Sequence, residues 1–267
     1  MLLLYSIYQE IKKMITGYIF YGAIVAVLLI NMSGNIAKDF STSETYNLIQ
    51  IIGMNSAGKT ELLTLNDATC TKIFLHGSQG YLWMFASLLV SAPFVMLMCS
   101  AKKNNNIRFE IYRMGKFAYV FTKGVASVLV AGVIMCVGYG LYGIVLSIFL
   151  PVGEGLSLWM IVKRLTEMFF YGMSSILLTY CLSAVMKNKY LVLCIPFMAN
   201  YLLKSLLDRP GLAQMEWRTV INPSSPSYLF SMEYVQRLEV VAFWIGMFAL
   251  SLFAYYMVLN RRCDCGE

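Results

Sequence analysis

The stretch that decides the fold is GVASVLVAGVIMCVGYGLYGIVLSIFLPVG, residues 124–153, which contains no Asp, Glu, Lys, Arg or His. A helix of about 20 apolar residues crosses the roughly 30 Å hydrocarbon core of a bilayer, so this run is long enough for one span. Similar runs predict six spans in all, at about residues 14–33, 81–101, 120–150, 167–186, 190–207 and 239–260. We therefore expect an all-α integral membrane protein, with residues 1–267 forming a single six-helix transmembrane domain.

The composition supports a lipid environment. The chain has 267 residues, of which 59% are hydrophobic and 13% are charged. A soluble domain normally carries about a quarter charged residues, and a soluble surface with so little charge aggregates. The net charge of +7 does not indicate nucleic-acid binding, because the basic residues lie at the ends of the apolar runs.

The segment before the first run is amphipathic. In MLLLYSIYQEIKKM, Leu4, Ile7, Tyr8 and Ile11 recur on one helical face, which predicts an interfacial helix at residues 2–13, lying in the plane of the membrane. The two longest connections, residues 34–80 and 208–238, are predicted to be loops on the opposite, outer side.

The orientation follows from the positive-inside rule, which counts Lys and Arg near span ends. The densest basic cluster lies between the second and third runs, and further basic residues follow the fourth and sixth runs. We therefore expect a multi-pass protein of the cell membrane with both termini in the cytoplasm.

The sequence GMNSAGKT, residues 53–60, satisfies the Walker A pattern through Gly53, Gly58, Lys59 and Thr60. A phosphate-binding loop requires a parallel sheet and a following helix to hold its backbone N–H groups in place, and such a domain does not fit between two spans. The orientation also places this segment outside the cell, away from ATP. We reject the nucleotide-binding interpretation and expect no cofactor.

No enzymatic signature stands out. The single histidine, His76, is the only candidate base of a catalytic triad, the cysteine spacings form no convincing metal site, and the interiors of the six runs hold no ionisable residue. Ionisable groups within the membrane usually mark ion-coupled transport or intramembrane proteolysis, so we expect neither of these functions, no bound metal and no catalytic site.

A row of small residues in the third run, Gly132, Cys136 and Gly140, allows helix backbones to approach closely. The row predicts either ordinary packing within one bundle or a dimer seam that slides during transport.

The loop AKKNNNIRFEIYRMGKFAYVFTKGVAS, residues 101–127, predicts a short amphipathic cytoplasmic helix that floats at the headgroups or docks on a soluble partner. In its layout of a lead helix, six spans and this basic R-x-E…R…G-K…K loop, the chain resembles the membrane (permease) subunits of type-2 ATP-binding-cassette exporters, and it looks similar to permease-like proteins of Gram-positive gut bacteria. The resemblance implies that the loop carries a coupling helix whose Arg108, Glu110, Arg113, Gly115 and Lys116 face a separate ATPase subunit. It also implies a homo- or heterodimer of membrane subunits.

The expected function is thus that of a permease subunit of an ATP-driven exporter of a peptide, a lipid-linked compound or a drug. One alternative is a non-transporting membrane immunity, assembly or accessory protein that binds its partner through the outer loops. A membrane enzyme is a third, which the lack of acid–base residues in the runs disfavours.

The orientation predicts the outcome of reporter fusions. A fluorescent reporter that matures only in the cytoplasm should fluoresce when it is fused after Lys103 or after Lys187, because both positions follow even-numbered spans. The measurement is whole-cell fluorescence normalised to protein level. Signal from only one of the two fusions contradicts the predicted arrangement of spans.

Overall fold

The computed structural model describes residues 2–38, 45–66, 69–76, 79–103, 106–150, 157–186, 188–207 and 217–264, and nearly all of them are helical. Within these residues, five helical segments are long and apolar enough to cross a bilayer: α6 (Gln79–Lys103), α8 (Lys116–Phe149), α9 (Leu158–Ser175) continued by α10 (Leu177–Val185), α11 (Lys189–Leu207) and α13 (Tyr234–Asp264). A sixth arises if α1 (Leu2–Ile15) and α2 (Tyr18–Ser33), which meet at a 66° bend, form one broken span. The predicted all-α membrane bundle is confirmed.

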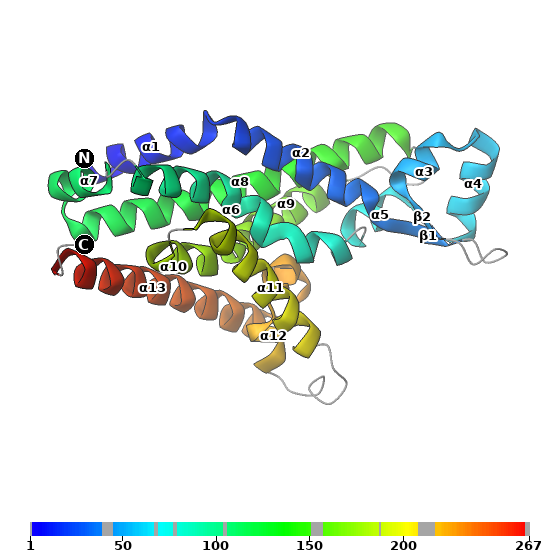
Figure 1. The fold of residues 1–267 in the computed structure, drawn as a ribbon. Helices are drawn as coiled ribbons and strands as arrows, with labels where there is room; N and C mark the ends of the chain where they lie inside the picture. Colours follow the sequence, from blue (N-terminus) through cyan, green and yellow to red (C-terminus); the bar gives the residue numbers. More distant parts are fainter. Residues whose placement is uncertain are drawn as a thin grey trace.

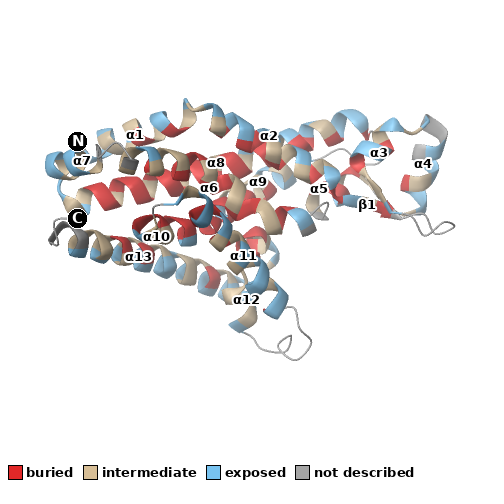
Figure 2. Ribbon diagram, in the orientation of Figure 1, coloured by how far each residue is buried: buried red, intermediate tan, exposed pale blue. Residues whose placement is uncertain are grey.

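Helix α8 lies at the centre of the bundle. It has 34 residues and is therefore about 51 Å long. Helix α9 is its main neighbour, while α1 and α2 pack along it one after the other (Figure 1). Buried residues concentrate on α8 and α9 (Figure 2), so the core is the contact between these two helices and the elements around them.

Helices α11 and α13 lie at the outside of the bundle. In the most apolar 18 residues of each of these helices only 17% of the residues are buried, whereas the corresponding share is 56% in α6 and in α8. Large apolar side chains of α13, such as Ile245, Leu250 and Phe253, are exposed. Exposed apolar surface of this extent on apolar helices is suited to contact with lipid.

The first predicted outer loop contains a folded module. Strands β1 (Asn35–Lys38) and β2 (Thr45–Asn47) pair antiparallel, and helices α3 (Leu48–Gly53), α4 (Ser56–Leu65) and α5 (Cys70–His76) follow. A capping box starts α3: Asn47 Oδ1 accepts from Gln50 N at 2.9 Å, and Gln50 Oε1 accepts from Asn47 N at 3.0 Å. The module extends from the end of the bundle opposite the two termini (Figure 1).

The second predicted outer loop is partly helical as well. Residues 208–216 lie outside the described residues, and α12 (Trp217–Ile221) and the 3₁₀ helix η1 (Ser225–Ser231) follow. Helix α13 then begins at Tyr234, before the predicted start of the sixth span.

The fourth span differs from the prediction. Helix α9 begins at Leu158 rather than near residue 167, and Ser157 caps it by accepting a hydrogen bond from Met160 N at 3.3 Å. Its first ten residues include Lys163, Arg164 and Glu167, and hydropathy alone does not assign such a charged stretch to a span.

Glycines let the neighbouring elements approach α8 closely. A Cβ atom on Gly132 would lie 2.7 Å from a ring carbon of Phe169 in α9, and one on Gly140 would make an ordinary 3.6 Å contact with Leu165 of the same helix. Cys136, between them, is half-buried. The two glycines of the small-residue row thus face α9 of the same chain.

The closest approach of a glycine to the backbone of a neighbouring helix is at Gly172 of α9. A Cβ atom there would lie 2.5 Å from the backbone oxygen of Ala131 in α8. Because the obstacle is backbone, the substitution Gly172→Ala must push the two helices apart, and we expect it to lower the free energy of unfolding by about 1–3 kcal/mol.

The matched control is Gly246→Ala in α13, where a Cβ atom meets nothing within 4 Å. Alanine is the better helix former, so this variant should be neutral or slightly stabilised. Unfolding by titration with a denaturing detergent measures both variants. Equal stability of the two would contradict the close contact between α8 and α9.

Candidate functional site

The short helix α7 (Asn106–Met114) lies at the end of the bundle that also holds both termini (Figure 1). It connects α6 to α8, and Ile107, Ile111 and Met114 pack against the core. The turn into α8 depends on Gly115, whose φ of 85° is in the left-handed region that favours glycine.

The opposite side of α7 is a compact surface of two arginines and two aromatic residues. Phe109 is 78% exposed and Tyr112 is 96% exposed. Arg108 and Arg113 are exposed as well, and the i, i+4 spacing of Arg108 with Tyr112 and of Phe109 with Arg113 interleaves the four side chains. We call these four residues the α7 outer face.

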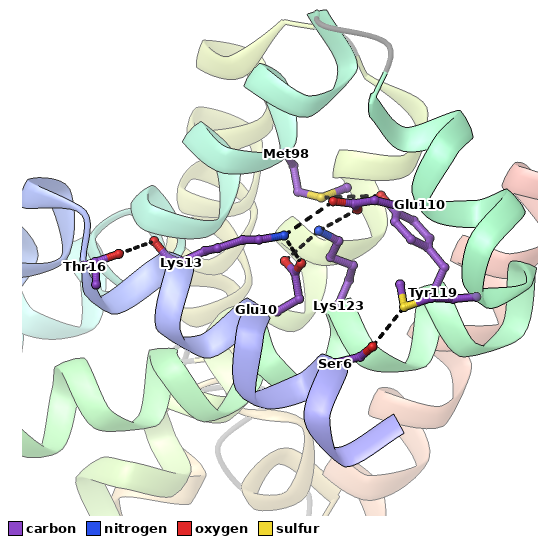
Figure 3. Close-up of polar contacts among 9 residues, drawn as sticks. Ser6, Glu10, Lys13, Thr16, Met98, Glu110, Tyr119 and Lys123 are labelled. Atoms are coloured by element: carbon purple, nitrogen blue, oxygen red, sulfur yellow. Dashed lines mark hydrogen bonds and ion pairs between the residues drawn. The ribbon is translucent and has the colours of Figure 1, made fainter. Parts of the chain in front are cut away.

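Four charged residues join α7 to α1 and α8, and we call them the ionic cluster (Figure 3). Lys123 Nζ of α8 lies 2.6 Å from Glu10 Oε2 of α1 and 3.0 Å from Glu110 Oε2 of α7. Lys13 Nζ of α1 lies 2.7 Å from Glu10 Oε1 and 3.5 Å from Glu110 Oε1. The two lysines flank the two carboxylates, so the cluster is neutral overall.

Two members of the ionic cluster are almost fully buried, so that each depends on its charged partners. The side chains of Lys123 and Glu10 are 6% and 7% exposed. The ammonium of Lys123 also lies 5.5 Å from the ring centroid of Tyr119, a cation–π distance. Buried charges are tolerated when they are paired, and removing one partner is strongly destabilising. The cluster therefore holds α1, α7 and α8 in one relative position.

The residues predicted to face an ATPase subunit have separate positions. Arg108 and Arg113 are exposed on the α7 outer face, whereas the Glu110 carboxylate points into the ionic cluster. Gly115 forms the turn between α7 and α8, and Lys116 Nζ donates to Asn260 Oδ1 of α13 at 2.7 Å. The structure thus leaves Arg108 and Arg113 exposed at the two edges of the α7 outer face and gives the other three residues partners or roles within the chain.

Sequence reasoning missed five residues of this region. Phe109 and Tyr112 were detectable, because the helical period that turns Ile107 and Ile111 inward turns these two outward. The cluster members Glu10, Lys13 and Lys123 carried no such signal. Lys123 meets Glu10 across 113 positions of the chain, and these contacts arise only when α1, α7 and α8 pack together.

A second charged pair lies inside the bundle. Arg164 Nη1 lies 2.9 Å from Glu167 Oε2 and donates to Ser227 O at 2.7 Å, and Glu167 Oε1 accepts from Phe230 N at 3.0 Å. The side chains of Arg164 and Glu167 are 2% and 6% exposed. The pair anchors η1 against α9 by satisfying two of its backbone groups.

This pair corrects the expectation that the spans are free of ionisable residues. Arg164 and Glu167 belong to a candidate span, Leu158–Val185, and Lys123 is buried within α8. The sequence argument against ion-coupled transport therefore loses this support. The expectation fails for this candidate span because α9 begins before the apolar run, and Arg164 and Glu167 pair with each other within the helix while they bond to backbone groups of η1.

The Walker A pattern lies in the folded module of the first predicted outer loop, formed by β1, β2 and α3 to α5, which we call the outer module. Gly53 ends α3, while Gly58, Lys59 and Thr60 lie within α4. The segment thus runs from helix to helix, whereas a phosphate-binding loop follows a strand of a parallel sheet. Across the described ranges, no three His, Cys, Asp or Glu residues form a group that could hold a metal.

The chain matches no protein-family model, and no curated protein matches it in sequence. The helices and their apolar surfaces define it as a multi-pass helical membrane protein.

The ionic cluster predicts a specific stability effect. Lys123→Met removes one of the two cations that Glu10 and Glu110 share, so that only Lys13 is left beside two carboxylates, and we expect it to cost about 3 kcal/mol of unfolding free energy. Adding Glu10→Gln should recover part of that loss, because the second change removes one unpaired charge. Detergent-titration unfolding measures the cycle.

The control is Lys12→Met in α1, where the side chain is exposed. This variant should change stability by less than about 0.5 kcal/mol. If Lys123→Met is no more destabilising than this control, the ionic cluster does not join the helices as described.

Proposed function

We propose that the chain is the transmembrane permease subunit of an ATP-driven exporter and works with a separate ATPase subunit. The observation that carries the proposal is the α7 outer face, an exposed set of two arginines and two aromatics between two spans. It lies at the end of the bundle that holds both termini, which the charge distribution predicts to be cytoplasmic (Figure 1).

The chemistry of this face suits a protein partner. Tyrosine and arginine are enriched among the residues that dominate binding energy at interfaces. Phe109 and Tyr112 give a large apolar area, and Arg108 and Arg113 flank it with positive charge. A partner groove with an apolar floor and acidic edges would complement such a helix.

The contacts that attach α7 to α1 and α8 support a mechanical role for this helix. Glu110 ties the helix to Lys123 of α8 and to Lys13 of α1, so that a displacement of α7 acts on both helices. Helix α8 continues for about 51 Å to the opposite end of the bundle and packs along α9. A movement driven by a docked ATPase would in this way reach the far side of the membrane.

In this proposal the chain itself is not an enzyme. Energy comes from the partner's ATP hydrolysis, and the bundle supplies the path for a peptide, a lipid-linked compound or a drug. Two copies of the membrane subunit, or one copy and a homologue, would complete that path.

The α7 outer face gives the decisive experiment. The full-length chain, purified from native membranes, should bring with it a protein that contains Walker A and ATP-binding-cassette signature sequences and hydrolyses ATP. Tyr112→Ala combined with Arg113→Glu should lower that recovery at least tenfold, because both changes remove exposed contacts without disturbing the ionic cluster. Mass spectrometry and ATPase activity are the two readouts.

The control is Tyr8→Ala in α1, which removes an aromatic side chain that is 59% exposed but lies outside α7. Recovery of the ATPase should stay at the wild-type level. Undiminished recovery with the α7 variant, or wild-type protein that carries no ATPase, would refute the proposal.

A second function is favoured by the folded outer module. Ile49 of α3 and Leu65 of α4 are 51% and 66% exposed, on a structured unit that extends from the bundle (Figure 1). Such a surface suits an immunity or assembly protein that binds a partner outside the cell. If Ile49→Glu with Leu65→Glu abolishes the capture of a partner while the α7 variant does not, this second function replaces the first.

A further inference from the structure

Two cations from different helices lie beside one aromatic ring of η1. The Nζ atom of Lys163 in α9 is 6.0 Å from the ring centroid of Phe230, and the guanidinium carbon of Arg237 in α13 is 5.4 Å from the same centroid. Helix η1 packs against both α9 and α13, and α13 begins away from the two chain termini (Figure 1). We call Lys163, Phe230 and Arg237 the dibasic site.

Neither cation of the dibasic site is neutralised by an acidic partner. In the described part of the chain, no carboxylate lies within ion-pair distance of Lys163 or Arg237. Arg237 donates from Nε to Leu229 O at 3.0 Å and from Nη2 to Met232 O at 3.1 Å. These two hydrogen bonds to backbone oxygens orient the guanidinium but leave its positive charge uncompensated.

The other charged residues near η1 do not cancel these two charges. Arg164, which follows Lys163, is paired with Glu167, and η1 itself has no charged residue. Glu233 and Glu239 are exposed, and neither forms an ion pair with a described residue. Like charges held near one ring repel each other, more strongly in partly apolar surroundings than in water. A shared anion would remove this repulsion.

The cationic groups of the dibasic site are accessible to such an anion. Lys163 and Arg237 are both half-buried, so part of each side chain reaches the surface. Lys163 Nζ and Arg237 Nη1 make no hydrogen bond among the described residues, and neither is one of the fully buried polar atoms. An anion can therefore contact both groups without a change in the fold.

The surroundings place the dibasic site at the membrane interface. Trp159, about one turn before Lys163, is 75% exposed, and Tyr234, at the start of α13, is 70% exposed. Exposed Trp and Tyr concentrate where spans leave the hydrocarbon, and long basic side chains near span ends extend to the headgroups. Further along α13, Ile245 is 63% exposed and offers apolar surface to an acyl chain.

We propose that the dibasic site binds the phosphate group of an anionic lipid, in the leaflet that surrounds the start of α13. Lys163 contributes a charge on a flexible stem, and Arg237 contributes a guanidinium that η1 already orients. A bound lipid would thereby connect α9 to α13. The site is separate from α7 and requires no ATPase subunit, so its failure would leave the proposed permease function untouched.

The test titrates purified full-length protein in an uncharged detergent and counts bound lipids by native mass spectrometry. The first phosphatidylglycerol should bind at least fivefold more tightly than phosphatidylcholine, whose choline cation offsets the phosphate charge, and added salt should reduce this preference. Lys163→Gln and Arg237→Gln should each weaken that first binding step about fivefold, which is the contribution of one basic residue at an anionic surface. Lys163→Arg should retain it.

The matched control is Lys189→Gln. Lys189 is a half-buried lysine of α11 whose Nζ lies 5.1 Å from the ring centroid of Tyr190, so it resembles Lys163 but belongs to another part of the bundle. This variant should bind the first phosphatidylglycerol as the wild type does. Thermal unfolding confirms that each variant is folded. Should Arg237→Gln unfold, Lys163→Gln still decides the outcome, because Lys163 makes no hydrogen bond in the described structure.

A further arm separates a lipid from a free anion. Glycerol 3-phosphate carries the phosphate without acyl chains, and at the concentration of the lipid it should not displace phosphatidylglycerol. Displacement would show that the dibasic site takes a soluble anion and would overturn the proposal. Equal binding of the two lipids by the wild type would overturn it too, as would unchanged binding in folded Lys163→Gln. An equal loss in Lys189→Gln would show diffuse attraction in place of a site.

Discussion

The rest of the structure depends on how closely other helices can approach α8. In lipid there is no hydrophobic force between helices, so association relies on packing and on small residues that bring backbones together. Glycines along α8 and α9 meet this need, and at Gly172 the two helix backbones themselves come closest, opposite Ala131. Once α8 and α9 are joined, α1, α2, α6 and the outer module pack around this pair, and α11 and α13 remain at the periphery.

Charges are placed where the bundle can pair them. At the end that holds the termini, two lysines and two glutamates join α1, α7 and α8. Within α9, Arg164 and Glu167 take backbone groups of η1 as partners, which lets an irregular segment lie against a span. Both arrangements use buried ion pairs to determine where elements sit rather than to add much net stability.

The candidate site shows how far periodicity carries. The spacing of Ile107, Ile111 and Met114 correctly predicted a short amphipathic helix between two spans. The resemblance to exporter subunits grouped Glu110 with Arg108 and Arg113, whereas the helical period places Glu110 three residues after Ile107 and four before Met114, on the inward side. Only the tertiary structure shows that Glu110 meets Lys13 and Lys123 on that side. Phe109 and Tyr112, which the helical period turns outward, are exposed.

The sequence by itself determined that this is a helical membrane protein, because runs such as residues 124–153 are stable only when hydrocarbon surrounds them and the backbone satisfies itself. It also located the short helix of the basic loop, a local property of about nine residues. The tertiary structure alone decided that α9 begins at Leu158, because Arg164 and Glu167 are acceptable there only through partners in η1 and α8. It likewise decided the ionic cluster, since this cluster joins residues that lie up to 113 positions apart in the chain.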